Sequence, residues 1–193
     1  MGRDFMKTIK YLLIITLPLI FLLSCNQESI STNQDNRIEA ATNSLDVKYN
    51  YTIKGNTSDE FSFLIEGNPI DLKYAELCET YDGSSRMISE MALKYKNWWY
   101  TEMEVAYNQL LKLLDEEDSQ NLIKSQTSWE SYIENKKYIE ESFFYQHKYD
   151  TVGELRKALS VSEEAEETKA RAYSLLEYLY IINGEINMVF SEQ

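Results

Sequence analysis

Residues 98–129 read WWYTEMEVAYNQLLKLLDEEDSQNLIKSQTSW, and the spacing of their apolar side chains decides the fold. Before the acidic run at residues 115–118, apolar residues recur every three or four positions, as on one face of a helix: Trp99, Ala106, Leu110 and Leu114. The spacing continues afterwards at Leu122, Gln126 and Trp129. The stretch therefore predicts two long helices, over about residues 85–116 and 120–147, joined as an antiparallel hairpin, with Asp118 or Ser119 capping the second helix.

Two further helices are predicted on either side of this hairpin. Asn68 is a good N-cap and Pro69 suits the first helical position, so a helix should begin there and end by Gly83. Ser160 and Glu163 have the spacing of a capping box, which predicts a last helix over about residues 163–182. Six glycines and two prolines are too few for a turn-rich all-β fold. The predicted fold class is mainly α: a helical hairpin or bundle of about four helices over residues 68–193.

Residues 46–67 carry a different pattern. Apolar and polar residues alternate on both sides of a turn-like segment at residues 55–59, and the apolar ones are Val47, Tyr49, Tyr51 and Ile53, then Phe61, Phe63 and Ile65. A period of two residues is typical of a half-buried strand, so this region predicts a short N-terminal β-hairpin. An extended segment held by its aromatic side chains is the alternative.

The N-terminus has the pattern of an export signal. Residues 6–10 are basic, residues 11–23 are apolar, and Ser24 and Cys25 follow. This arrangement predicts a signal peptide over residues 1–24. A cysteine directly after a small residue resembles the lipobox of bacterial lipoproteins, which implies lipidation of Cys25, while an ordinary signal with an incidental cysteine is the alternative. Residues 25–45 are polar and predict a flexible tether, so a lipid-anchored protein of the cell envelope is expected.

The net charge and the composition exclude several classes of ligand. The chain has 32 acidic and 19 basic residues, a net charge of -13, and removal of three basic residues and one acidic residue with residues 1–24 would leave -15. Acidic proteins repel phosphate backbones, so no nucleic-acid partner is expected. One histidine, His147, and one cysteine besides Cys25 give no metal-site spacing, and no phosphate or dinucleotide loop is present in the sequence. No metal and no cofactor are expected, and Cys78, on an apolar stripe, is predicted to be buried.

Glu102 raises the question of catalysis because it interrupts the apolar face of the first long helix. A carboxyl group in an apolar pocket could act as a general acid in glycan hydrolysis. The interpretation we favour is a carboxyl group without a catalytic role, either partly buried and paired with Arg171 or simply solvated, since acidic residues on helices are more often structural. The sequence therefore predicts a protein that is not an enzyme.

The helical part of the chain resembles a known family. The residues that carry the resemblance begin with Asn68, Pro69 and Asp71, continue through Trp99, Glu102, Tyr107, Gln126 and Trp129, and end with Thr168, Arg171 and Leu175. This pattern, over about residues 68–176, resembles the LprI-type lysozyme-inhibitor-like domain. The resemblance implies a small helical domain of the bacterial envelope that binds a protein without catalysis, with lysozyme or another basic envelope protein as partner. A generic envelope interaction or assembly protein without inhibitor activity is the alternative.

Six residues of this pattern are candidates for binding or for a structural network: Trp99, Glu102, Tyr107, Gln126, Trp129 and Arg171. Trp99 and Trp129 are expected in the core, whereas an exposed Trp98 or Tyr100 would be a candidate contact residue. Glu102, Gln126 and Arg171 are expected to form hydrogen bonds between helices, which would fix the register of the bundle.

Overall fold

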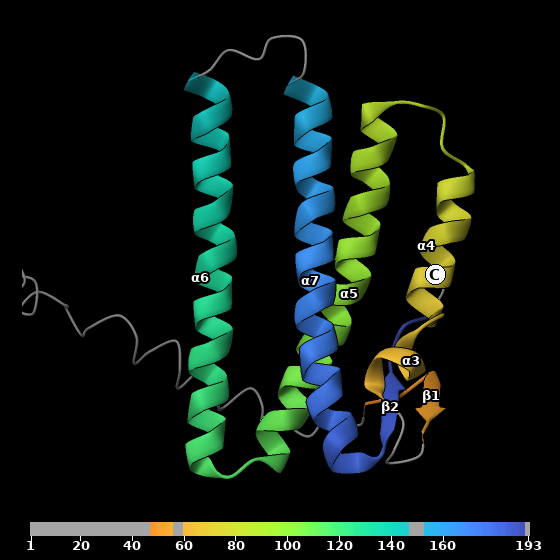
Figure 1. The fold of residues 1–193 in the computed structure, drawn as a ribbon, viewed down its shortest axis with the longest axis vertical. Helices are drawn as coiled ribbons and strands as arrows, with labels where there is room; N and C mark the ends of the chain where they lie inside the picture. Colours follow the sequence, from red (N-terminus) through yellow and green to blue (C-terminus); the bar gives the residue numbers. More distant parts are fainter. Residues whose placement is uncertain (1–46, 56–59, 147–152, 192–193) are drawn as a thin grey trace, which may run out of the picture. The chain divides into compact units, whose positions relative to one another are not determined.

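A computed structural model of the chain describes residues 47–55, 60–146 and 153–191, with only the backbone at residues 144–146. The predicted signal peptide, Cys25, the tether to residue 45 and His147 lie outside these ranges. The elements run, in order, β1 (Tyr51–Lys54), α3 (Phe61–Ile65), α4 (Pro69–Glu79), α5 (Ser85–Leu113), α6 (Glu116–Gln146), α7 (Gly153–Asn183) and β2 (Glu185–Met188) (Figure 1). The prediction of a mainly α fold is confirmed. In the described part of the chain, none of the helices combines the length and the apolar character needed to cross a membrane.

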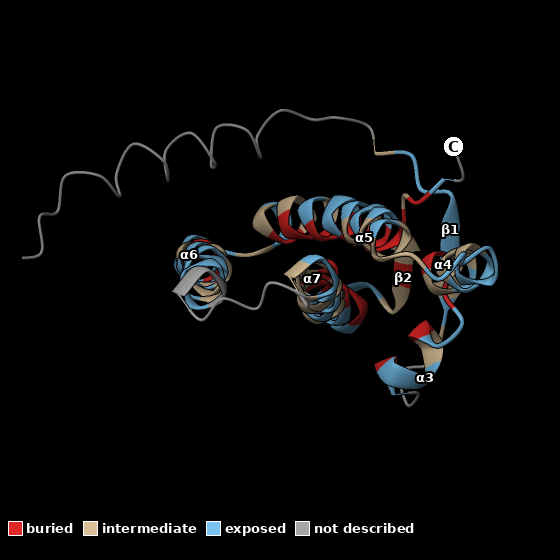
Figure 2. Cartoon of the chain, turned by 90° about the horizontal axis from the view of Figure 1, so that it is seen from above, coloured by how far each residue is buried: buried red, intermediate tan, exposed pale blue. Residues whose placement is uncertain are grey.

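The core lies mainly between α5 and α7, which run in parallel directions, side by side (Figures 1 and 2). Trp99 and Met103 of α5 and Leu175 and Leu176 of α7 are all buried in it. Each fully buried side chain of this size stabilises the fold by roughly 1.5–3 kcal/mol. The predicted α5–α6 hairpin is present, joined at residues 114 and 115, but α5 packs far more extensively on α7 than on α6.

Helix α6 is packed into the core only near its start. Leu122 and Ile123 are buried, whereas Ile139 and Phe143, farther along the helix, are 67% and 56% exposed. Asp115 caps this helix: its side chain accepts a hydrogen bond from the Asp118 amide at 2.9 Å. The prediction that Asp118 or Ser119 is the cap was therefore wrong, because both residues already lie inside the first turns of the helix. An acidic side chain in the first turn interacts favourably with the positive end of the helix dipole.

Helix starts were predicted correctly at one end of the domain and wrongly at the other. Asn68 caps α4 as predicted, since its Oδ1 accepts from the amides of Ile70 at 3.1 Å and Asp71 at 3.0 Å. By contrast, α7 begins at Gly153, and the expected capping box at Ser160 and Glu163 lies inside the helix. Packing of Ala158 in the core stabilises this additional length of helix, and it overrides the local signal.

The small sheet combines the two ends of the described chain. Strand β1 pairs in antiparallel register with β2, so that Tyr51 lies opposite Met188 and Lys54 opposite Glu185. The predicted partner segment, Phe61–Ile65, forms the short helix α3 instead. Phe61 and Ile65 are four residues apart and both are buried, because this spacing also places them on one side of a helical turn. The strand near Tyr51 was thus predicted, but its assigned partner was wrong.

Candidate functional site

A polar and aromatic cluster joins α4, α5 and α7. At its centre, the Asp71 carboxylate accepts hydrogen bonds from the Tyr95 hydroxyl at 2.5 Å, the Tyr173 hydroxyl at 3.1 Å and the Asn68 amide at 2.8 Å. Lys169 Nζ donates to the same carboxylate at 2.8 Å. Asn68 therefore caps the helix and also orients the acid that connects α4 to the other two helices.

Aromatic rings surround the ammonium group of Lys169 in this cluster. Its Nζ lies 5.7 Å from the ring centre of Tyr95, 5.8 Å from that of Trp99 and 5.2 Å from that of Tyr173. Burial acts to raise the pKa of Asp71, but the hydrogen bonds from Lys169, Tyr95 and Asn68 outweigh it and hold that pKa below its usual value. Burial and the nearby Asp71 carboxylate raise the pKa of both tyrosines. Asp71 and Lys169 therefore form a compensated ion pair whose charges are satisfied within the fold.

Glu102 lies on another side of α5 and holds the C-terminal segment. Its carboxylate is 1% exposed and accepts hydrogen bonds from the backbone amides of Val189 at 3.2 Å and Phe190 at 2.6 Å. Burial raises the pKa of Glu102 to about 7, although both hydrogen bonds act in the opposite direction. The prediction that Glu102 pairs with Arg171 was wrong, because the C-terminal backbone occupies both carboxylate oxygens.

The surroundings of Glu102 also argue against the general-acid interpretation. Glu102 is 1% exposed and is not among the residues that line the cavity of about 20 Å³ bounded by Tyr49, Ala106 and Glu185. That volume suits about one water molecule, not a sugar ring. The carboxyl group is therefore placed to anchor a chain segment.

Gln126 and Arg171 are brought together as predicted. Arg171 Nε donates to Gln126 Oε1 at 2.9 Å, and Arg171 Nη2 donates to the Ser125 hydroxyl at 3.2 Å. Gln126 is 1% exposed, and its amide nitrogen reaches Glu130 at 3.2 Å and the Met103 sulfur at 3.8 Å. Burial lowers the pKa of Arg171. This network links α6 to α5 and α7, and it does not include Glu102.

The remaining candidates are mainly core residues. Trp99 and Tyr107 are buried, and Trp129 is partly buried against the same core. Trp98 is partly buried, with its ring edge-on to Phe190, whereas Tyr100 is exposed. Cys78 is exposed and not buried as predicted, because only the start of α4, around Ile70, reaches the core. No group of metal-ligating side chains occurs in the described residues.

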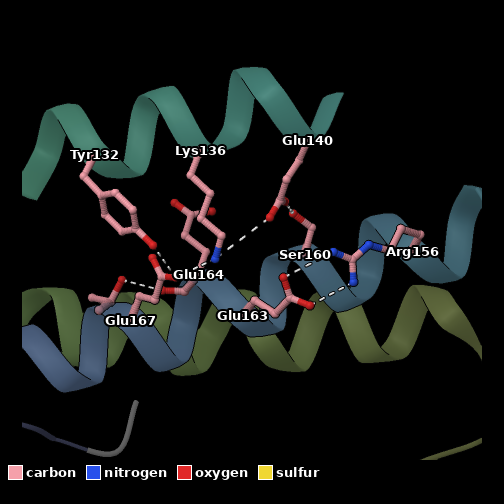
Figure 3. Close-up of polar contacts among 9 residues, drawn as sticks. Tyr132, Lys136, Glu140, Arg156, Ser160, Glu163, Glu164 and Glu167 are labelled. Atoms are coloured by element: carbon pink, nitrogen blue, oxygen red, sulfur yellow. Dashed lines mark hydrogen bonds and ion pairs between the residues drawn. The ribbon is translucent and has the colours of Figure 1, made fainter. Parts of the chain in front are cut away.

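A second polar set bridges α6 and α7 beyond Gln126 (Figure 3). Lys136 Nζ lies 2.5 Å from Glu167 and 3.9 Å from Glu140, and the Ser160 hydroxyl donates to Glu140 at 2.5 Å. Arg156 pairs with Glu163 at 2.8 Å along α7. We call these contacts the α6–α7 seam. Long charged side chains thus span the space between α6 and α7, whereas apolar side chains fill the space between α5 and α7.

Sequence reasoning missed Tyr95, Lys169 and Tyr173. Asp71 was noted only as part of the family-like pattern, and its bond to Lys169 spans 98 positions. Lys and Tyr on helices are usually solvated or snorkelling residues, so nothing local marks them as a cluster.

Comparison with known proteins gives one match. A profile of the family described as Lysozyme inhibitor LprI matches residues 78–175, which is half of the chain. The match begins in the last turn of α4, covers α5 and α6, and ends within α7. It leaves out Asn68, Asp71 and both strands. No curated protein sequence and no solved structure matches the chain.

Proposed function

The chain belongs to the family of lysozyme inhibitor LprI, and from this membership we propose that it binds a lysozyme-type protein and blocks it without catalysis. The observation that carries the proposal is the position of the match. It covers α5, α6 and the part of α7 up to residue 175, and it leaves out both strands. The proposal therefore rests on the long helices and not on the sheet.

Charge supports the same proposal. The chain carries a formal net charge of -13, whereas animal-type lysozymes are strongly basic. Opposite net charges speed the encounter of two proteins and favour binding at low ionic strength. Many acidic proteins are acidic for solubility, so charge adds to the family match and does not replace it.

The direct test is an inhibition assay. The full chain, solubilised in detergent, is added to a basic animal-type lysozyme acting on a bacterial cell-wall suspension, over a series of salt concentrations. We expect dose-dependent inhibition that weakens as salt rises, because salt screens exposed charges. An unrelated protein of similar negative charge is the control for non-specific neutralisation of the lysozyme. Absence of inhibition at large molar excess would contradict the proposal and would favour a general envelope interaction or assembly role.

We propose further that the protein is anchored to a membrane of the cell envelope through a lipid on Cys25. The basic start, the apolar run over residues 11–23 and the Ser24–Cys25 pair support this. Replacing Cys25→Ala should release the protein into the soluble fraction of cells, measured by fractionation and immunoblotting. Cys78→Ala is the matched control, since this thiol lies exposed on α4 and should not affect retention. Retention of the Cys25→Ala variant would contradict the anchor.

A further inference from the structure

The junction between α5 and α6 is short, and its sequence contains no helix-breaking residue. α5 ends at Leu113 and α6 begins at Glu116, so the junction consists of Leu114 and Asp115 alone. Neither glycine nor proline occurs from residue 84 to residue 152. Glycine commonly ends a helix, and proline breaks one when it lies inside. The sequence of the junction is therefore compatible with one helix that continues from α5 into α6.

The helical hydrogen bonds stop at the junction and resume immediately after it. The Leu114 amide still donates to the Leu110 carbonyl at 3.0 Å, as in a helix, but Leu114 is extended, with φ −83° and ψ 152°. The next carbonyl, that of Asp115, already accepts from the Ser119 amide at 2.9 Å. Rotation of the backbone at these two residues would therefore join the helices, since a helical ψ is about −42°.

The bent and straight forms of the junction differ mainly in how a few backbone amides are satisfied. In a continuous helix, the amides of residues 115–118 would donate to the carbonyls of residues 111–114. In the bent form, the Asp115 side chain accepts from the Asp118 amide at 2.9 Å and replaces one of these bonds. The bend is therefore stabilised locally by one cap, and a straight junction would gain backbone hydrogen bonds in its place.

A straight junction would separate α7 from α5 of the same chain. α6 and α7 each have 31 residues, and a helix of that length is about 46 Å long. α6 would then end about 46 Å beyond the junction, whereas α7 now starts near the far end of α5 (Figure 1). The six residues between Gln146 and Gly153 span at most about 25 Å, so α7 would have to leave with α6.

A single open chain would expose its core, and a second open copy supplies the surface that covers it. Trp99 of α5 and Leu175 and Leu176 of α7 are buried against each other's helices. The α6–α7 seam and the bond from Arg171 to Gln126 hold α6 and α7 together as one unit. The α7 of another copy has the shape and apolar composition that fit the exposed side of α5.

We propose that the α5–α6 junction is a hinge, and that two copies of this chain exchange α6, α7 and β2 through it to form a domain-swapped dimer. α5 of each copy then packs on α7 of the other, and β1 pairs with β2 of the other. Exchange of identical elements rebuilds the buried contacts of the single chain and changes only the hinge. This inference is independent of lysozyme binding.

The acidic run at the hinge opposes this exchange. The two straightened helices would lie antiparallel and cross at their hinges, so residues 115–118 of both copies would come close together. All four of these residues are acidic. Repulsion between the two runs therefore favours the single bent chain at low ionic strength, and added salt should favour the dimer because it screens exposed charges.

A cross-link between two differently tagged chains detects the exchange. Lys96 of α5 and Glu164 of α7 form an ion pair at 2.7 Å, so one tagged chain carries Lys96→Cys and the other carries Glu164→Cys. Both also carry Cys78→Ala, which removes the exposed thiol of α4. The full chains are mixed in detergent, unfolded in urea, refolded together and treated with a short bismaleimide. A mixture in which one chain lacks its introduced cysteine is the control for reaction through another thiol.

Two matched pairs of variants test the hinge. Glu116→Pro places proline at the first position of α6, where it is favoured in the bent form and disfavoured inside a continuous helix. Glu116→Ala removes the same charge without this constraint. Asp115→Ala removes the cap of the bent form, and Asp118→Ala removes a carboxylate of the same size that is not the cap.

We expect the fraction of product that carries both tags to rise with protein concentration and with salt. Glu116→Pro should lower it at least about tenfold relative to Glu116→Ala, because each dimer contains two hinges. For the same reason, Asp115→Ala should raise it at least about threefold relative to Asp118→Ala. Circular dichroism melting curves check that all variants remain folded.

Two results would overturn the proposal. The first is the absence of doubly tagged product at every protein concentration. The second is an equal amount of product in both members of either pair, which would show association without opening of the junction. Neither result bears on lysozyme inhibition, which has its own assay.

Discussion

Helix α7 has two neighbours among the long helices, and it contacts them by different means. Toward α5 it presents buried apolar residues such as Leu175 and Leu176, with Ala172 allowing close approach. Toward α6 it presents Arg171, Glu167 and Ser160, which make hydrogen bonds and ion pairs. The first interface therefore supplies most of the stability, since exposed ion pairs contribute only about 0–1 kcal/mol each. The second interface chiefly fixes how far along α7 the helix α6 is placed.

The largest expected effect tests the apolar interface. Trp99 is 0% exposed between α5, α4 and α7, so Trp99→Ala should lower the free energy of unfolding by about 3–5 kcal/mol. Urea unfolding followed by circular dichroism measures this change. Trp129→Ala is the control on α6, and we expect a smaller loss because Trp129 is only partly buried. An equal loss of unfolding free energy in the two variants would contradict the conclusion that the α5–α7 interface supplies most of the stability.

The next effect concerns the buried carboxylate on α5. Because burial raises the pKa of Glu102 from 4.5 to about 7, the folded state binds more protons than the unfolded state between these values. Stability should therefore fall by about 3 kcal/mol as the pH rises from 4.5 through 7, and level off above. Urea unfolding at several pH values tests this.

Glu102→Gln supplies the control for that pH dependence. The amide does not titrate, so the fall in stability between pH 5 and 7 should be largely absent in this variant. Asp71 changes stability in the opposite direction and only in stronger acid, because its pKa is lowered. An unchanged pH dependence in Glu102→Gln would mean that another group is responsible.

A smaller effect is expected at the buried hydrogen bond between Gln126 of α6 and Arg171 of α7. Gln126→Ala would leave Arg171 Nε without its acceptor in a half-buried position, at a cost of about 1–3 kcal/mol. Gln126→Glu keeps an oxygen acceptor for the guanidinium group and should recover most of the lost stability. Thermal melting of both variants is the measurement, and a loss in Gln126→Glu as large as that in Gln126→Ala would contradict this role of the hydrogen bond to Arg171.

The smallest effect is expected in the seam itself. Lys136→Ala removes the ion pairs to Glu167 and Glu140 and should lower the free energy of unfolding by no more than about 1 kcal/mol.

Native-state hydrogen exchange should show weaker amide protection in α6 after Gln126 than in α5. Protection of the two helices to the same degree would show that the polar interface is as stabilising as the apolar one.

Features of the fold that depend on residues close together in the sequence could be predicted, and most contacts between distant residues could not. The Asn68 cap, the start of α5 and the Gln126–Arg171 link were predicted, because local patterns or the family resemblance carry them. The dominant α5–α7 packing was not, since the short connection pointed to α5 and α6 as the closest pair. The capping box at Ser160 failed because core packing continued α7 through it.

The sheet and the Asp71 cluster show the same limit. Phe61 and Ile65 fit one face of a strand or one side of a helical turn equally well, and Phe63, which would share that face in a strand, is 71% exposed in the helix. Strand β2 has four residues and no distinctive pattern, so its pairing with β1 could not be foreseen.

The contacts of β1 and Glu102 with the segment over residues 185–190 have a consequence for biosynthesis. The side chain of Asn50 donates to the carbonyl of Val189, 139 positions later, and Glu102 receives its two amides from the same C-terminal segment. A polypeptide that emerges from the ribosome N-terminus first must therefore keep β1 unpaired until residues 185–190 have been made. A product truncated before residue 185 would lack the partners of β1 and leave Glu102 hydrated. Synthesis of the segment that contains β2 is thus required before this part of the fold can form.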